Sequence, residues 1–146
     1  MSTYYSISVG SDHGGFPLKS VIVDHLESLG HRVTDEGTHD ETSVDYPDFA
    51  DKVTAAITSN TADLGVLICG TGIGISIKAN RQKGIRAALV YNALTAKMAK
   101  AHNNANILCL GARTTDPETA KHLVETWLST EFEGDRHQRR LDKLDS

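Results

Sequence analysis

The sequence has little of what marks several common classes of protein. Of its 146 residues only 5% are aromatic, three are proline and two are cysteine. The cysteines, Cys69 and Cys109, form no CxxC pair and have no zinc-site spacing, so we expect free thiols. No apolar run approaches the roughly 20 residues that a membrane span needs. The first residues, Met-Ser-Thr-Tyr-Tyr, lack the basic and apolar regions of a secretion signal, which favours a cytoplasmic location.

An excess of positive charge is also missing. Fifteen lysines and arginines stand against nineteen acidic residues, and the net charge at pH 7 is −4. Such a chain has no field to hold a nucleic-acid backbone, so general nucleic-acid binding is disfavoured. The charged fraction of 23% and the hydrophobic fraction of 39% are ordinary for a globular protein, and the length suits one domain over 1–146.

What the sequence does contain is a regular alternation of short apolar runs and segments of helical period. The runs predict strands at 4–9, 31–35, 64–69, 85–90 and 106–110. Apolar spacing predicts helices at about 17–29, around 49–57, from the glycine turn at 70–74 to about 79, and at 94–101 and 117–128, with a loop at 36–47. This pattern predicts an α/β fold: a single-domain, Rossmann-like open parallel sheet of about five strands, with helices on both faces and a C-terminal helical tail.

In such sheets ligands bind outside the carboxyl ends of the strands, near the switch in strand order. Four positions therefore matter most, namely those after Val9, Cys69, Val90 and Leu110.

The strongest local signal is the glycine turn Gly70-Thr71-Gly72-Ile73-Gly74, which follows a buried strand and opens a helix. Its glycines allow several N–H groups to point at one spot beside the positive end of a helix dipole, which makes an anion site. Ile75 stands where a dinucleotide fingerprint needs glycine, and no Gly-Lys-Ser/Thr closes a P-loop. The alternative is a plain tight turn.

Cys69 precedes that turn directly. A thiol beside converging amides favours its thiolate, which can accept a proton or attack carbon. The alternative is a small buried hydrophobe. For Cys109, between Leu108 and Leu110 inside a predicted strand, we adopt that alternative.

Three polar groups complete the candidates. Asp12-His13 follows the first strand, and His102-Asn103 follows the fourth predicted helix, where a histidine is often only a cap. In a helical tail Arg136 and Arg140 share a face, which is either solvated or binds phosphate. Together, a thiolate base, an anion-binding turn, histidines and spaced arginines describe proton transfer beside a carbonyl on a phosphorylated substrate, with no metal and no cofactor needed.

The chain resembles the type B ribose-5-phosphate isomerases over nearly its whole length. The shared segments are 11–16, 45–47, 69–76, 78–80, 84–87, 102–103, 111–113 and the tail Phe132-Glu133-Gly134-Asp135-Arg136-His137-Gln138-Arg139-Arg140. The Cys-Gly-Thr-Gly-x-Gly segment and the Arg-His tail are the most specific. Some relatives use a glutamate after the glycine turn instead of the cysteine, but here that position is Ile75.

The resemblance implies a role for each matched residue. Cys69 would be the base that moves a proton between C1 and C2, and the amides of Gly70, Thr71, Gly72, Ile73 and Gly74, with the Thr71 side chain, would hold the cis-enediolate oxygens. His102 would assist opening of the furanose ring. The remaining substrate contacts would come from Asp12, His13, Tyr46 and Asn103, and the phosphate would be taken by Arg113, Arg136 and Arg140.

The resemblance also implies an activity and an assembly. The activity is interconversion of D-ribose 5-phosphate and D-ribulose 5-phosphate, a step of the pentose phosphate pathway. Alternatives are isomerisation of a six-carbon substrate, allose 6-phosphate or galactose 6-phosphate, and a sugar-phosphate or nucleotide-binding module without chemistry. The family is dimeric or tetrameric with sites shared between subunits, so we expect a homodimer whose tail, 133–146, packs at the interface.

Overall fold

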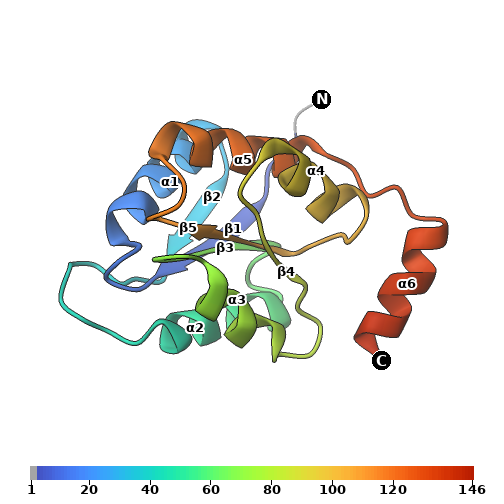
Figure 1. Ribbon diagram of the computed structural model, residues 1–146, viewed down its shortest axis with the longest axis horizontal. Helices are drawn as coiled ribbons and strands as arrows, with labels where there is room; N and C mark the ends of the chain where they lie inside the picture. The colour runs from blue at the N-terminus through green and yellow to red at the C-terminus, as the bar shows by residue number, and fades with distance from the viewer. Residues whose placement is uncertain (1–2) are drawn as a thin grey trace.

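Five parallel strands lie in the order β2-β1-β3-β5-β4 in the computed structural model, which describes residues 3–146 (Figure 1). All four neighbouring pairs are parallel. The strands are β1 (Ser6–Ser11), β2 (Arg32–Asp35), β3 (Leu64–Cys69), β4 (Ala87–Leu89) and β5 (Ile107–Gly111). The predicted α/β fold with an open parallel sheet is confirmed.

Helices cover both faces of the sheet (Figure 1). One face carries α1 (Phe16–Ser28), α4 (Ala93–Ala101) and α5 (Pro117–Ser129), and the other carries α2 (Tyr46–Thr58) and α3 (Ile73–Asn80). Each face has its own apolar core. Every residue of the central strand β3 is buried, which explains its uninterrupted apolar sequence.

The order of the strands reverses between β1 and β3. The chain leaves β1 toward β2 on one side and returns to β3 on the other, so the connections that follow β1 and β3 diverge at the carboxyl edge. Such a switch point is where open parallel sheets bind ligands. The amide of Asp12 donates to the carbonyl of Ile68 at 3.3 Å, which joins the two connections here.

The only tryptophan of the chain anchors α5 to the turn between α4 and β5. Trp127 is fully buried, and its Nε1 donates to the carbonyl of Ala105 at 3.2 Å. The ammonium of Lys100 lies 4.9 Å from the indole centroid, and burial lowers the pKa of this lysine. The turn that follows α4 is therefore held to the core by α5.

The last helix, α6 (Arg136–Asp145), stands beyond β4, away from the layers around the sheet (Figure 1). Its far end is held by an ion pair of 3.0 Å between Arg86 and Asp145, and Leu141 is its buried apolar residue. The predicted helical tail is thus confirmed. Among residues 3–146 no helix combines the length and apolar character needed to cross a membrane.

Several boundaries differ from the prediction. The strand predicted at 4–9 is Ser6–Ser11. The strand predicted at 85–90 is reduced to Ala87–Leu89, Ile73 and Gly74 lie in the first turn of α3, and α2 begins at Tyr46 inside the predicted loop. Pro47 explains the last difference, because its fixed φ suits the first turn of a helix.

Candidate active site

The glycine turn after β3 has a backbone that only glycine adopts easily. Gly72 has φ of 78°, and a Cβ there would lie 2.5 Å from Leu89 Cδ1. This conformation lets its amide point back at the preceding strand, where it donates to Cys69 Sγ at 3.2 Å. The hydroxyl of Thr71 accepts from the amide of Ile73 at 3.2 Å, at the start of α3.

Cys69 is held by the segment that follows the neighbouring strand β5. It is 5% exposed, and its carbonyl accepts from the amide of Ala112 at 2.9 Å. Its sulfur lies at the positive end of α3 and already receives one N–H, a setting that suits a sulfur with negative charge. Local structure therefore supplies an orientation for a sulfur nucleophile or base.

Cys109 is placed quite differently. It pairs with Leu67 in the middle of the sheet and is fully buried. Burial, with a smaller contribution from Cys69, raises the pKa of the Cys109 thiol well above its ordinary value. The prediction that Cys109 is a buried hydrophobe is confirmed.

The loop after β1 lies beside the glycine turn. Asp12 is 8% exposed, and its Oδ1 accepts from the amide of Gly15 at 2.9 Å. His13 Nδ1 accepts from the amide of Val44 at 3.1 Å, which ties the long loop before α2 to this edge. A Cβ on Gly14 would lie 3.9 Å from the Gly70 nitrogen. The two connections at the switch point are therefore in contact.

Two more predicted residues reach the same turn. A Cβ on Gly74 would lie 2.6 Å from the hydroxyl of Tyr46, so glycine is what lets this ring lie on α3. The amide of Arg113 donates to the carbonyl of Gly70 at 2.9 Å, and its Nε would lie 3.5 Å from a Cβ there. We call this group the carboxyl-edge cluster: Asp12, His13, Tyr46, Cys69, Gly70, Thr71, Gly72, Ile73, Gly74 and Arg113.

His102 lies in a second group. It follows α4, and its ring stacks on that of His137 with centroids 4.1 Å apart and planes 17° from parallel. Oε1 of Glu133 lies 3.8 Å from Nε2 of His102 and 3.4 Å from Nε2 of His137. Burial, then the neighbouring His102 and Arg136, lowers the pKa of His137. We call His102, Glu133 and His137 the histidine cluster.

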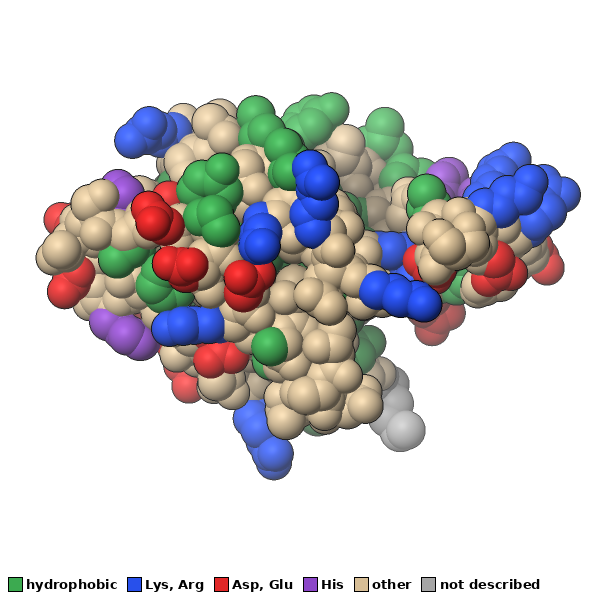
Figure 2. All heavy atoms as spheres, turned by 90° about the horizontal axis from the view of Figure 1, so that it is seen from below, with side chains coloured by type: hydrophobic (Ala, Val, Ile, Leu, Met, Phe, Trp, Pro, Cys, Tyr) green, Lys and Arg blue, Asp and Glu red, His purple; other side chains and the backbone are tan. Residues whose placement is uncertain are grey.

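The remaining predicted residues flank the histidine cluster. Asn103 follows His102, is exposed, and accepts at its carbonyl from Nε of Arg86 at 2.9 Å. Arg136 and Arg140 are exposed on α6. Figure 2 shows lysine and arginine side chains crowded at the α6 end of the molecule, apart from the rest of the surface.

The carboxyl-edge cluster and the histidine cluster lie at opposite ends of the parallel strands. Cys69 ends β3 at the carboxyl edge, whereas His102 leads into the amino end of β5, which pairs with β3 from Gly65↔Ile107 to Cys69↔Gly111. At roughly 3.3 Å per residue, those four steps separate the edges by about 13 Å. Within one chain, Cys69 and His102 do not reach the same atoms.

The sequence predicted no metal site, and it did not predict that His102, Glu133 and His137 lie together. The ligand atoms of His102, Glu133 and His137 all lie within 4.8 Å of one another. His102 is distant in the sequence from the other two residues, and Glu133 precedes α6, so no helical spacing indicates that the three meet.

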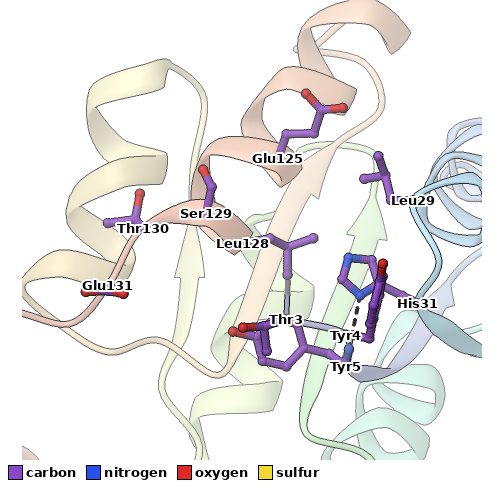
Figure 3. Close-up of a pocket in the computed structure, with 10 residues that line it drawn as sticks. All are labelled: Thr3, Tyr4, Tyr5, Leu29, His31, Glu125, Leu128, Ser129, Thr130 and Glu131. Atoms are coloured by element: carbon purple, nitrogen blue, oxygen red, sulfur yellow. Dashed lines mark hydrogen bonds between the residues drawn. The ribbon is translucent and has the colours of Figure 1, made fainter. Parts of the chain in front are cut away.

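Two pockets in the described part of the chain lie away from Cys69. One of about 550 Å³ lies at the amino end of β1, where Tyr5 and His31 stack and Tyr5 donates its amide to His31 Nδ1 (Figure 3). Another of about 390 Å³ lies between β4 and α6 and is lined by Asn103, Leu144 and their neighbours. Neither of these two pockets is lined by the glycine turn.

Comparison with known proteins identifies the family. The sequence profile of the Ribose/Galactose Isomerase family matches residues 7–144. The chain belongs to this family. Among curated members, ribose-5-phosphate isomerase B of Escherichia coli K12 is 44% identical over 138 residues, which cover 94% of this chain and 93% of that protein.

Solved structures of family members share the whole fold. Ribose-5-phosphate isomerase B of Clostridium thermocellum is 51% identical with a TM-score of 0.95, covering 96% of this chain and 95% of the other. The Mycoplasma genitalium enzyme with bound ribulose-5-phosphate is 44% identical with a TM-score of 0.92, covering 96% and 93%. The resemblance noted in the sequence is confirmed, and the arrangement of sheet and C-terminal helix is that of this isomerase family.

Proposed function

We propose that the chain interconverts D-ribose 5-phosphate and D-ribulose 5-phosphate with Cys69 as the base. The observation that carries the proposal is the geometry at Cys69: a sulfur at the switch point, at the start of α3, with the Gly72 amide donating to it at 3.2 Å. The Mycoplasma genitalium relative with bound ribulose-5-phosphate supports the choice of substrate.

The proposed reaction moves one proton between carbons and one between oxygens. The Cys69 thiolate removes the proton from C2 of the open-chain aldose, and the electron pair moves onto the carbonyl oxygen O1 to give a cis-enediolate. The hydroxyl proton on O2 passes to the neighbouring O1, and the thiol returns its proton to C1, which leaves the ketose with its carbonyl at C2. The amides of the glycine turn and Thr71 face the developing charge at the positive end of α3 and would stabilise it. This assignment gives the charge to N–H groups, so no metal is required for the proton transfer.

The other proposed roles need a second copy of the chain. A group that opens the sugar ring must come within about 2.6–3.2 Å of the atoms it protonates or deprotonates. His102 lies at least about 13 Å from Cys69 along the sheet. We therefore place Cys69 of one protomer opposite His102, Asn103, Arg136 and Arg140 of its partner in a two-fold dimer with two equivalent sites.

Exposed apolar side chains on both sides of the sheet are available to that partner. Ile73 and Ile77 on α3, next to the glycine turn, are each 52% exposed, and Tyr91 and Leu94 at the start of α4 are exposed as well. Hydrophobic side chains are visible over the face that carries α2 and α3 (Figure 2). Large apolar side chains beside a polar site are typical of an interface that completes the site.

Solvent deuterium tests the activity directly. An enzyme that transfers a proton through a thiol incorporates deuterium from D₂O into the transferred position of the product sugar. Cys69→Ala is expected to abolish this incorporation, and Cys109→Ala to retain it. A sugar-phosphate-binding module without chemistry incorporates none. Turnover on ribose, allose and galactose phosphates, compared side by side, decides between five- and six-carbon substrates.

Refolding of mixed variants tests the shared site. Cys69→Ala and His102→Ala homodimers are each expected to be inactive. If each site draws these residues from different chains, the heterodimer holds one doubly damaged site and one intact site. Random reassortment makes half of the dimers heterodimers, so the mixture regains roughly a quarter of wild-type activity. A mixture that stays inactive, with heterodimers verified by mass, refutes the shared site and leaves the deuterium result standing.

A further inference from the structure

The histidine cluster contains a buried polar atom without a partner. His137 is 4% exposed, and within the part of the chain that the structure describes its Nε2 makes no hydrogen bond. Oε1 of Glu133 lies 3.4 Å away, which is close enough for an ion pair when the imidazole is protonated, but the two atoms form no hydrogen bond. A buried polar atom without a partner is costly, so something that binds at Nε2 would be stabilising there.

The distances in the cluster are close to those of a tetrahedral zinc site. Zinc binds histidine nitrogen and carboxylate oxygen at about 2.0–2.2 Å, which places its ligand atoms roughly 3.3 Å from one another. The carboxylate oxygen of Glu133 lies 3.4 Å and 3.8 Å from the two Nε2 atoms, and all three ligand atoms lie within 4.8 Å. Because the two ring planes are nearly parallel, their nitrogen lone pairs do not converge, and the His102 ring must turn out of the stack to aim both nitrogens at one ion. His102 can make this movement because its side chain is 39% exposed at the end of a helix.

We propose that His102, Glu133 and His137 bind a divalent transition-metal ion of the zinc class, and that the bound ion withdraws His102 from the sugar. The second part rests on the proposed function. Two imidazoles with one carboxylate is a donor set that holds zinc with one position left for water. Magnesium and calcium prefer all-oxygen ligands, so they are expected to bind poorly.

Neighbouring charges limit the strength of this site. Glu133 contributes one negative charge, but Arg136 next to His137 opposes a bound cation. The ion is therefore expected to be removed by a chelator, and its effect on the protein to be reversible.

The binding test uses the full-length protein, freed of metal with a chelator and titrated with Zn²⁺ in competition with a chromophoric indicator. One Zn²⁺ per chain is expected. His137→Gln and Glu133→Gln are each expected to weaken binding at least about tenfold, since even outer-shell partners of a metal ligand contribute 10- to 100-fold. Both changes keep side-chain size, and a circular dichroism spectrum verifies that each variant is folded.

Matched controls locate the ion. His122 and Glu131 are exposed residues of the same types. His122→Gln and Glu131→Gln are expected to bind Zn²⁺ as the wild type does, and so is Cys69→Ala. Absence of stoichiometric binding, binding that survives His137→Gln unchanged, or binding that is lost in Cys69→Ala overturns the site.

Activity tests the second part separately. Zn²⁺ at the concentration that saturates the binding curve is expected to inhibit isomerisation, and EDTA to restore it. Mg²⁺ is expected to have no effect. Full activity with the site saturated overturns the claim about His102. A protein that isomerises nothing, with or without Zn²⁺, refutes the proposed function and leaves the binding titration to decide on the site.

Discussion

The carboxyl-edge cluster and the histidine cluster are built in different ways. The first lies on the ends of β1, β3 and β5, the buried centre of the sheet, and its turn is held by backbone hydrogen bonds from Ala112 and Arg113. The second lies on the end of α4 and on a helix that stands away from the layers (Figure 1). Groups that must face a reacting carbon within a few tenths of an ångström belong on rigid elements. Groups that hold a non-reacting phosphate can be placed on a less rigidly packed helix such as α6.

The largest expected effect on activity comes from a change in the carboxyl-edge cluster. Cys69→Ala removes the proposed base, which costs about 10²–10⁴ in rate for a typical general base. We expect kcat to fall by at least that factor while ribose 5-phosphate still binds, because the proposed phosphate contacts lie elsewhere. Steady-state kinetics and calorimetric binding measure the two quantities, with Cys109→Ala as the control. Near-normal turnover in Cys69→Ala would sink the assignment.

A smaller effect on activity is expected from changes to the arginines of α6. Arg136→Ala or Arg140→Ala removes a proposed charge-assisted contact to phosphate, and such contacts contribute about 1.5–3 kcal/mol, so KM is expected to rise roughly 10- to 100-fold with less change in kcat. Arg139, exposed on the same helix, supplies the control because Arg139→Ala lowers the net charge equally. An Arg136→Ala, Arg140→Ala double variant with unchanged KM would show that this face of α6 is merely solvated.

The two thiols of the chain are expected to differ in their reactivity. Because burial raises the pKa of Cys109, its reactive thiolate is suppressed at pH 8 in the folded protein and becomes available only as the chain unfolds. An alkylating reagent is expected to label one thiol per chain in buffer and two in denaturant. In Cys69→Ala the folded protein should remain unlabelled, and substrate should protect the wild type. Peptide mapping that finds the label on Cys109 without denaturant would contradict this.

The smallest effect is expected at the C-terminal end of α6, and it concerns stability. Asp145→Asn breaks the ion pair with Arg86, whose side chains are 21% and 41% exposed, and such surface pairs contribute about 0.2–1 kcal/mol. We expect a change of that size or less in the free energy of unfolding, smaller still at high salt. Urea unfolding compares it with Asp142→Asn on the same helix. A loss of several kcal/mol would mean that α6 is as integral to the fold as β3.

Features encoded within a short stretch of sequence were predicted well. The apolar run 64–69 and the glycines that follow it contain their own signals, and the structure has β3 and the turn at those residues. The strand predicted at 85–90 was too long because Ile85 and Val90 are buried just outside the paired residues, although the amide of Val90 still donates to the carbonyl of Cys109 at 3.1 Å. Burial sets the apolar pattern, but pairing requires a neighbour, and β4 pairs with β5 through only three residues.

Features that depend on meetings between distant segments were not predictable from patterns. Nothing local indicates that Tyr46 lies on Gly74, or that His102 stacks on His137. The resemblance supplied roles for most of these residues, but it did not assign one to Glu133 or His137. The first contact follows from the packing of α2 on α3, and the second from the path of the chain after α5, and no periodicity encodes either.

The environment of Trp127 makes the chain its own optical probe. It is the only indole in the protein, it donates to Ala105 in the turn that begins at His102, and the ammonium of Lys100 lies over its ring. The excited state of an indole responds to a nearby cation and to the strength of its N–H bond. Its emission spectrum and lifetime should therefore follow movements of the His102 turn in the unlabelled wild-type protein, with no dye and no substitution.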